Sequence, residues 1–89
     1  MKNLMFTTKH RGVFVGKVAD EMDLTPTTLT NIKEARMVIR WRGGNGVQGI
    51  AAEGPTENCK LSSISDIDVL HDVTGVFPVS DAAAEKIWL

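Results

Sequence analysis

The clearest pattern along the chain is an alternation of apolar and basic side chains over residues 35–42. Successive side chains of a strand point to opposite faces. The pattern therefore predicts a strand with one apolar face, formed by Ala35, Met37, Ile39 and Trp41, and one largely basic face, formed by Arg36, Val38, Arg40 and Arg42. Glycine and asparagine at 43–46 accept the positive φ of a tight turn. We therefore expect a hairpin in which residues 47–52 return as the partner strand and Gly54-Pro55 ends it.

Other segments rich in Val, Thr and Phe predict further short strands. Residues 3–8 and 12–19 read as a hairpin around the loop Lys9-His10-Arg11-Gly12, and Gly16 indicates a bulge or a close backbone approach. Residues 27–31 fit either a strand or a turn. Residues 56–66 look like a loop with a short strand near 60–62, and residues 69–79 contain another strand. Pro78 places that last strand at a sheet edge or a bulge, because proline donates no ladder hydrogen bond.

The chain ends in a predicted helix. The Ser80 hydroxyl can accept a hydrogen bond from a first-turn amide, Asp81 suits the positive helix end, and three alanines follow. Ile87 and Trp88 give this helix an apolar side. The fold class predicted for residues 1–89 is one mainly β (α+β) domain: a small antiparallel sheet or partly open barrel of about five strands, with one C-terminal helix.

Composition limits the class of protein. The 89 residues include 43% hydrophobic and 24% charged side chains, as in a globular domain. Uncharged apolar stretches are much shorter than the ~20 residues that cross a bilayer, and the polar residues after Phe6 do not continue a secretory signal. One cysteine forms no internal disulfide. We expect a cytoplasmic protein with no membrane partner. A small core and exposed strand edges favour a homo-oligomer.

Charge is unevenly distributed along the chain. Residues 1–44 carry eight basic and four acidic side chains, residues 45–89 carry two and seven, and the total is −1. Two interpretations are open. The basic and acidic segments pair with each other, within a subunit or between subunits, or a basic face binds an anion. For the second interpretation the candidate ligand contacts are Arg36, Arg40, Arg42, Lys9 and Arg11, since guanidinium groups suit phosphate oxygens. The two loop residues join the strand arginines only if the two hairpins pair.

Catalytic and metal chemistry have weaker support. Cys59 could pair with His10 or His71, with Asp72 as the orienting acid, but no local signature surrounds them. No set of metal ligands, calcium-loop pattern or phosphate-binding loop appears. We predict no catalytic residue, metal or cofactor. The chain has five Phe and Trp residues and no Tyr, which disfavours a nucleic-acid binder that stacks bases.

Four segments carry a resemblance to a known group of proteins: residues 7–14, 35–41, 54–56 and 69–74, which read TTKHRGVF, ARMVIRW, GPT and VLHDVT. The chain resembles short uncharacterised proteins encoded by tailed bacteriophages and prophages. The resemblance implies a viral accessory protein made in the bacterial cytoplasm. The resemblance further implies action by stoichiometric binding, which in small phage proteins often means occupying a host protein, sequestering an immune nucleotide, or assembling into a larger body.

These observations lead to one main hypothesis and two alternatives. The main hypothesis is a non-catalytic phage accessory protein, homo-oligomeric, that binds a host factor or an anionic nucleotide and so could inhibit a host defence system. The first alternative is a virion or assembly component whose charged halves pair between subunits. The second is a small hydrolase or nuclease that uses His10 or His71, which requires the two histidines to converge in one cleft with an acid.

Overall fold

The computed structural model describes residues 1–40, 46–56 and 59–88. Over these residues the chain forms six strands and two helices. They are β1 (Lys2–Thr8), β2 (Val13–Val18), β3 (Leu29–Arg40), α1 (Gly46–Glu53), β4 (Lys60–Leu61), β5 (Ser65–Leu70), β6 (Val73–Pro78) and α2 (Asp81–Trp88).

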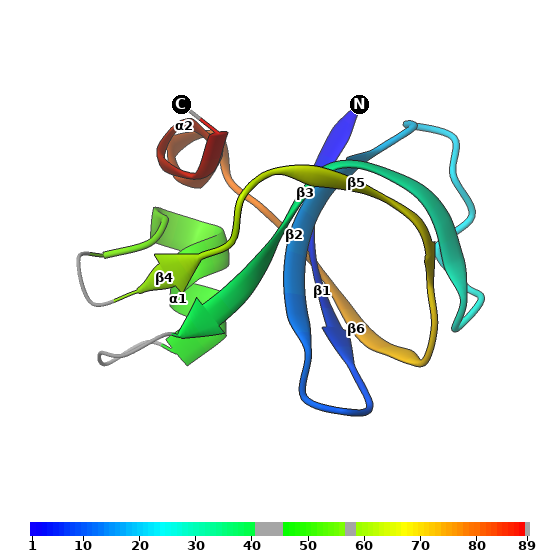
Figure 1. Ribbon diagram of the computed structural model, residues 1–89. Helices are drawn as coiled ribbons and strands as arrows, with labels where there is room; N and C mark the ends of the chain where they lie inside the picture. Colours follow the sequence, from blue (N-terminus) through cyan, green and yellow to red (C-terminus); the bar gives the residue numbers. More distant parts are fainter. Residues whose placement is uncertain (41–45, 57–58, 89) are drawn as a thin grey trace.

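The strands form one open antiparallel sheet, which confirms the predicted mainly β class. The strand order is β4-β3-β2-β1-β6, and β5 pairs with the first half of β3. Figure 1 shows β3 and β5 arching over one side of the sheet while both helices lie on the other side. Within the described residues β6 pairs only with β1, so Pro78 lies in an edge strand as expected.

Both faces of the central strands are buried. In β1, Met5 packs into a core under the helices, whereas Leu4 and Phe6 pack into a second core under the arch of β3 and β5. The helix-side core also contains Val15, Val38, Ile50, Val79, Ala83 and Ile87, and the arch-side core contains Val18, Leu29, Ile32, Ala35, Leu70 and Val73. Burial on both faces explains why the apolar run in β1 does not alternate with polar residues.

The predicted burial of the apolar face of residues 35–41 is confirmed for Ala35 and is wrong for Met37 and Ile39. Met37 and Ile39 are 42% and 50% exposed, whereas Val38, expected among the arginines, is 1% exposed in the helix-side core. The reason is that the pairing of β5 with β3 ends at Ala35, so Met37 and Ile39 lie beyond the arch-side core, whereas Val38 on the opposite face packs under the helices. Earlier in β3, Glu34 adopts a left-handed φ of 49° in a bulge between Ile32 and Ala35, which keeps both of these side chains in the arch-side core. Trp41 lies outside the described residues.

The predicted strand over residues 47–52 is also wrong, because α1 occupies Gly46–Glu53. Ile50 and Ala51 pack into the helix-side core. Gly54 ends the helix with φ 92° and donates its N–H to the Ile50 carbonyl over 2.9 Å, and Pro55 follows. A left-handed glycine followed by proline is a helix stop. Residues 1–40, 46–56 and 59–88 therefore contain two helices where one was expected, and residues 47–52 do not form the second strand of a hairpin.

Three smaller differences concern the remaining strands. Residues 27–31 and 35–40 belong to one continuous strand, β3. The short strand expected near 60–62 is confirmed as β4, but the last two residues of the predicted loop at 56–66 already belong to β5, and the predicted strand at 69–79 is interrupted at Asp72, whose φ is 57°. A left-handed residue here turns the chain between β5 and β6.

The predicted hairpin loop, the close approach at Gly16 and the helix cap are confirmed. Thr8 donates its N–H to the Gly12 carbonyl over 2.9 Å, and Arg11 takes the left-handed φ of the turn, 65°. A Cβ atom at Gly16 would overlap the Cγ2 atom of Ile32. Ser80 Oγ accepts the Ala83 N–H at 3.1 Å. No helix among the described residues is long and apolar enough to cross a membrane.

Candidate functional site

Arg36 lies half-buried between β3, the residue after β4 and the end of α2. Its Nε donates to the Ser62 carbonyl at 2.7 Å, and its Nη1 donates to the Ile87 carbonyl at 2.5 Å. Ile87 is in the last turn of α2, where carbonyls lack intrahelical partners and a cation is favoured by the helix dipole. Arg36 therefore caps α2 and joins three segments. Two of its donor groups are used inside the protein.

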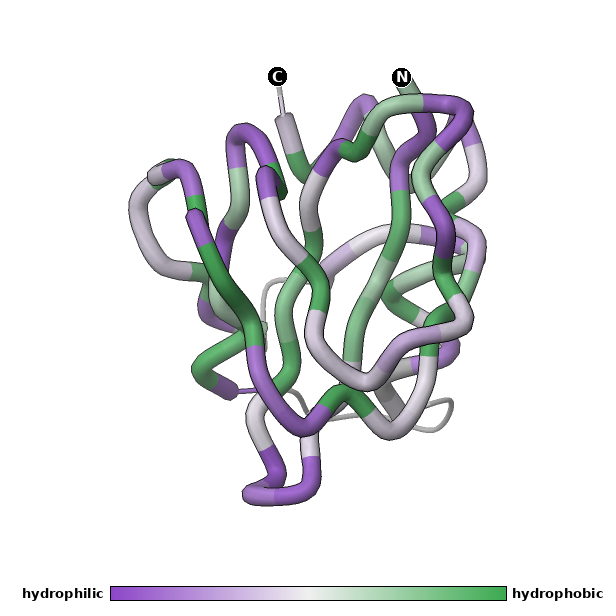
Figure 2. Tube along the Cα trace, turned by 90° about the vertical axis from the view of Figure 1, so that its right-hand side faces the viewer, coloured by the Kyte–Doolittle hydropathy of each residue, from purple (hydrophilic) through white to green (hydrophobic). Residues whose placement is uncertain are grey.

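Lys9 and Arg11 occupy the tip of the β1–β2 hairpin, and both are exposed. Figure 2 shows this hydrophilic loop projecting from the lower end of the molecule. Within the described residues neither side chain has an ion pair or a hydrogen bond. These two cations are placed where an external anion could reach them.

The remaining predicted contacts lie elsewhere. Arg40 is exposed at the end of β3, opposite Lys60 of β4, and Arg42 lies outside the described residues. The pairing of β2 with β3 ends at Phe14 and Met37, after which Figure 1 shows β3 diverging from the β1–β2 hairpin toward α1 and β4. Arg36, Arg40 and the hairpin cations are therefore not brought together on one surface.

Among the described residues, the ion pair of Lys33 with Asp66 joins the basic and the acidic half of the chain. Asp66 in β5 accepts the Glu34 N–H at 3.0 Å and lies 3.6 Å from the Nζ of Lys33. The hydrogen bond from the Glu34 amide, with the nearby Lys33 charge, lowers the pKa of the Asp66 carboxyl below its usual value. Asp66 thus satisfies the amide of a left-handed residue in the β3 bulge. Its role here is structural.

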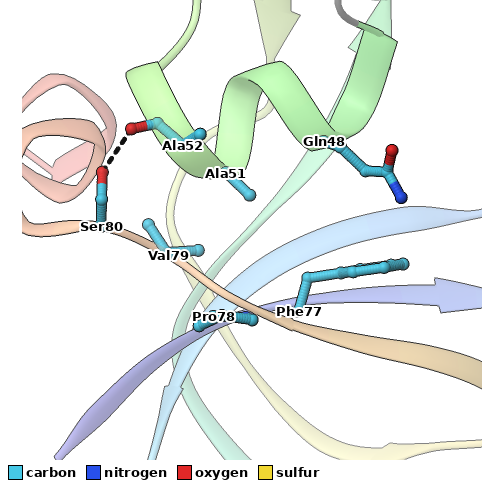
Figure 3. A pocket seen from close by; sticks show the side chains of 7 residues that line it. All are labelled: Gln48, Ala51, Ala52, Phe77, Pro78, Val79 and Ser80. Atoms are coloured by element: carbon cyan, nitrogen blue, oxygen red, sulfur yellow. Dashed lines mark hydrogen bonds between the residues drawn. The ribbon is translucent and has the colours of Figure 1, made fainter.

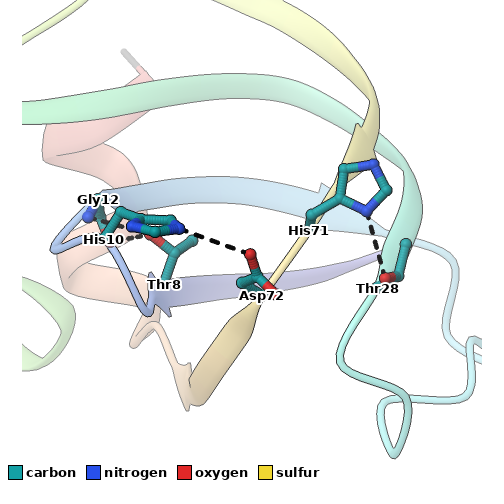
Figure 4. Close-up of polar contacts among 6 residues, drawn as sticks. All are labelled: Thr8, His10, Gly12, Thr28, His71 and Asp72. Carbon is teal, nitrogen blue, oxygen red and sulfur yellow. Dashed lines mark hydrogen bonds and ion pairs between the residues drawn. The ribbon is translucent and has the colours of Figure 1, made fainter.

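The two histidines point away from each other. His10 Nε2 lies 3.7 Å from the Asp72 carboxylate, and these side chains are 80% and 55% exposed. His71 Nδ1 shares a 3.4 Å hydrogen bond with the Thr28 hydroxyl. Figure 4 shows the rings on opposite sides of Asp72, and Cys59 packs beside the helix-side core. The convergence that a histidine-dependent hydrolase requires is not seen in the protomer.

Among residues 1–40, 46–56 and 59–88, no three His, Cys, Asp or Glu side chains gather closely enough to hold a metal ion. Asp66 is engaged with Lys33 and the Glu34 amide, and Asp72 with His10.

A cavity of about 380 Å³ lies between α1 and the end of β6. Ala51 and Ala52 of α1 form one wall, Phe77 and Pro78 form the other, and Gln48 extends over the opening (Figure 3). The two alanines leave this space unfilled because their side chains are short. The lining is mostly apolar, as in pockets that take a small apolar group.

An exposed apolar surface lies on the distal half of β3. Met37 and Ile39 share the face opposite Val38, and Ile64 follows β4 at 48% exposure. The Met37 N–H donates to Ser62 Oγ at 2.7 Å, which holds the loop bearing Ile64 against β3. We call Met37, Ile39 and Ile64 the apolar patch. Sequence reasoning missed it because strict alternation placed Met37 and Ile39 in the core.

The missed features carried partial signals in the sequence. The spacing of Val47, Ile50 and Ala51 is that of one helix face, and Gly54-Pro55 is a helix stop. The cavity between α1 and β6 depends on this helix. The apolar patch has no such signal, because the exposure of Met37 and Ile39 depends on where the pairing between β3 and β5 ends.

Comparison with known proteins gives one family. The family model for a domain of unknown function, DUF6948, matches residues 1–87. No curated protein and no solved structure matches the chain. Since the matched segment covers nearly the whole length, the chain belongs to the DUF6948 family.

Proposed function

We propose that this protein is a non-catalytic binding protein that works as a homo-oligomer, and that subunits associate through the apolar patch. The observation that carries the proposal is the exposure of Met37, Ile39 and Ile64, at 42%, 50% and 48%. Single exposed apolar side chains are common, but Met37 and Ile39 lie two positions apart on one face of β3, and grouped apolar side chains mark association surfaces. The resemblance to tailed-phage proteins supports an accessory role in a bacterial cytoplasm, where such an oligomer would bind a host factor.

Charges around the patch favour a second copy of the chain as its occupant. Arg40 and Lys60 lie beyond one end, on adjacent strands, and have no ion pair within the described residues. Asp66 lines a hollow with Met37 near the other end. Asp66 binds the amide of Glu34, and Arg40 lies six positions farther along β3. Arg40 and the site of Asp66 are therefore separated by about 20 Å of strand. A two-fold axis through the patch would set the cations of each copy against Asp66 of the other.

The test is the mass in solution of three variants. Ile39→Lys and Ile64→Lys place a charge in the patch, and Val69→Lys is the matched control, because Val69 is 47% exposed on β5 beside Thr30. Size-exclusion chromatography with light scattering should give an oligomer for the native protein and Val69→Lys. In the two patch variants the dissociation constant of the oligomer should be about tenfold higher or more than in the native protein. These variants should therefore be monomers at concentrations where the native protein is still an oligomer. A native mass of 9.7 kDa at all concentrations refutes the proposal.

A second candidate is binding of an anionic nucleotide at the hairpin tip. It is favoured by the exposure of Lys9 and Arg11, which have no partner in the described part of the chain. Calorimetric titration with a nucleoside diphosphate should show binding that weakens when Lys9 and Arg11 are replaced with Ala, and that weakens at higher salt. No heat of binding, or an unchanged affinity in the double variant, contradicts this candidate.

A virion or assembly component is the third candidate, and the same patch would serve it. Its distinguishing result is recovery of the protein in purified particles in a fixed ratio to the capsid protein. Recovery only in the soluble fraction of infected cells contradicts an assembly role and leaves the oligomeric accessory protein in place.

A further inference from the structure

We propose that the outer edge of β6 is a peptide-binding site, which adds one extended segment of another protein as an antiparallel strand. This inference goes beyond the proposed function and does not depend on it, because the apolar patch lies on β3 and the loop after β4. Edge strands bind peptides through backbone hydrogen bonds, and pockets for alternate side chains provide specificity.

The register of β1 and β6 shows which backbone groups of β6 are free. Val79 donates its N–H to the Asn3 carbonyl over 3.0 Å, so Asn3 and Val79 form a hydrogen-bonded pair. This pair is next to the pair of Leu4 with Pro78 in the ladder. Hydrogen-bonded pairs alternate in an antiparallel ladder. Phe77 is therefore in a bonded pair with Met5, and Val76 is in a non-bonded pair with Phe6. It follows that the N–H and C=O of Val76 point away from β1.

Pro78 agrees with this assignment. It lies two residues from Val76, so its backbone faces outward as well, where its missing N–H costs the β1–β6 ladder nothing. Its carbonyl is still available to an added strand. Within the described residues no partner binds the outward N–H and C=O of Val76, so the edge offers one donor and two acceptors.

Two hollows follow this edge. The first, about 340 Å³, lies between residues 73–76 of β6 and the loop at 24–27. The second is the 380 Å³ cavity between Phe77, Pro78 and α1. One residue of a strand occupies a volume of about 160 Å³, which is the product of its rise of about 3.3 Å, the strand spacing of about 4.8 Å and the sheet spacing of about 10 Å. Each hollow therefore holds about two residues of extended chain, and neither holds a folded domain.

The hollows suit the two faces of an added strand. Phe77 packs against the helix-side core and Val76 against the arch-side core, so the hollows open toward opposite faces of β6. Residues directly opposite each other on paired strands share a face. A peptide residue opposite Phe77 would project toward Ala51 and Ala52 in the cavity of Figure 3. Its neighbour opposite Val76 would project toward the groove.

The lining of each hollow indicates the peptide's composition. The cavity beside α1 favours an aliphatic side chain, because Phe77, Pro78 and two alanines line it. The groove is lined by Thr25, Thr27 and Thr74, among other residues, and favours a hydroxyl side chain.

Charge identifies the residues that flank the peptide. The segment leading to the groove carries Asp20, Glu21 and Asp23, and residues 18–32 contain no basic side chain. Asp23 Oδ1 accepts the Thr25 N–H at 3.0 Å and the Thr25 hydroxyl at 2.7 Å, which holds this carboxylate next to the groove. Asp20 is paired with the N-terminal amine at 3.3 Å, which leaves Glu21 and Asp23, and Lys9 lines a hollow with Val73 and Thr74. The two carboxylates outnumber this lysine and favour a peptide with Lys or Arg after its aliphatic and hydroxyl residues, because an antiparallel strand ends near residues 73 and 74 of β6.

The probe is the peptide acetyl-Thr-Leu-Thr-Val-Lys-Lys-amide, in which Leu would face Phe77 and the second Thr would face Val76. Its control is the same peptide methylated on the backbone nitrogen of that second Thr, which removes the donor to the Val76 carbonyl. Titration into ¹⁵N-labelled protein should shift the amides of Val76, Phe77 and residues 24–27. The methylated peptide should bind about tenfold more weakly or worse.

Two protein variants separate backbone pairing from side-chain packing. Val76→Pro removes the outward N–H without breaking a β1–β6 hydrogen bond, and Val76→Ala is its matched control, since both lose the valine side chain. We expect affinity for the probe to fall about tenfold in Val76→Pro relative to Val76→Ala. Amide spectra of both variants without peptide verify that the fold is intact.

Several results would overturn the inference. Equal affinity for the two peptides, or equal affinity of the two variants, would show that no strand is added. Shifts confined to Ala51, Ala52 and Phe77 would show capture of an apolar side chain alone. Absence of any shift at about 5 mM peptide would show no site. None of these results bears on the oligomer, because Ile39→Lys should bind the probe like the native protein.

Discussion

Arg36 connects β3 to the C-terminal helix, and replacing it tests whether this arginine is structural or is a ligand contact. In Arg36→Ala the carbonyls of Ser62 and Ile87 lose donors that now lie 2.7 and 2.5 Å away. Each hydrogen bond to a charged group contributes about 1.5–3 kcal/mol. Because the guanidinium is only half-buried, the lower value applies, and we expect a loss of about 3 kcal/mol.

That loss is large for a domain of this size. At about 0.05–0.15 kcal/mol per residue, the whole fold is stable by roughly 4–13 kcal/mol. A loss of about 3 kcal/mol should lower the Tm by about 15 °C. At an m-value of about 1.5 kcal/mol/M it should also lower the urea midpoint by about 2 M.

The assay is urea unfolding followed by tryptophan fluorescence, with two controls. Arg40→Ala removes an exposed arginine from the same strand and should change stability by less than about 0.5 kcal/mol. Arg36→Lys keeps the charge but reaches one carbonyl at most, and should fall between the native protein and Arg36→Ala. Equal unfolding midpoints for Arg36→Ala and Arg40→Ala would refute the capping role of Arg36. Arg36 would then again be a candidate for contact with an anionic ligand.

Three further predictions concern local features of the fold. Ser80→Ala removes the acceptor of a first-turn amide of α2 and should cost about 1 kcal/mol in thermal unfolding, and an unchanged Tm would contradict the cap. Gly16→Ala drives a methyl group against Ile32 and should cost about 1–3 kcal/mol by urea unfolding; a neutral result would mean that the strands can separate slightly there. The pKa of Asp66 is lowered in the folded state by the Glu34 amide, so its contribution is present above the unfolded pKa of about 3.9 and is lost as pH falls through the lower folded value. Melting curves from pH 7 down to about pH 2 should therefore show a loss of stability near and below pH 4 that is smaller in Asp66→Asn, and parallel curves for the two proteins would contradict this role.

Short-range elements were predictable from the sequence because their hydrogen bonds join residues close in the chain. The β1–β2 loop forms through the Thr8 N–H and the Gly12 carbonyl, and α2 begins where Ser80 Oγ accepts the Ala83 N–H. Each signal lies within five residues. The hairpin loop and the helix cap are therefore predictable from the local sequence, although the left-handed φ is that of Arg11 and not of the loop glycine.

Residues 47–52 show where local signals compete. Valine and isoleucine after a glycine-rich turn favour a strand, whereas the spacing of Val47, Ile50 and Ala51 and the stop at Gly54 favour a helix. Packing of Ile50 and Ala51 against the helix-side core decides for the helix. The prediction failed because the alternation in residues 35–42 made a hairpin the simpler interpretation.

By itself the sequence determined a mainly β domain with a capped C-terminal helix, since those features depend on side-chain period and on caps a few residues long. Only the tertiary structure decided which side chains of β3 are buried and what Arg36 contacts. The pairing of β3 with β5 ends at Ala35, and the partners of Arg36 lie 26 and 51 residues away. Periodicity shows which side chains share a face of one strand, but it does not show how far another strand covers that face or which distant carbonyls an arginine reaches. These long-range contacts determined where the candidate binding surfaces lie.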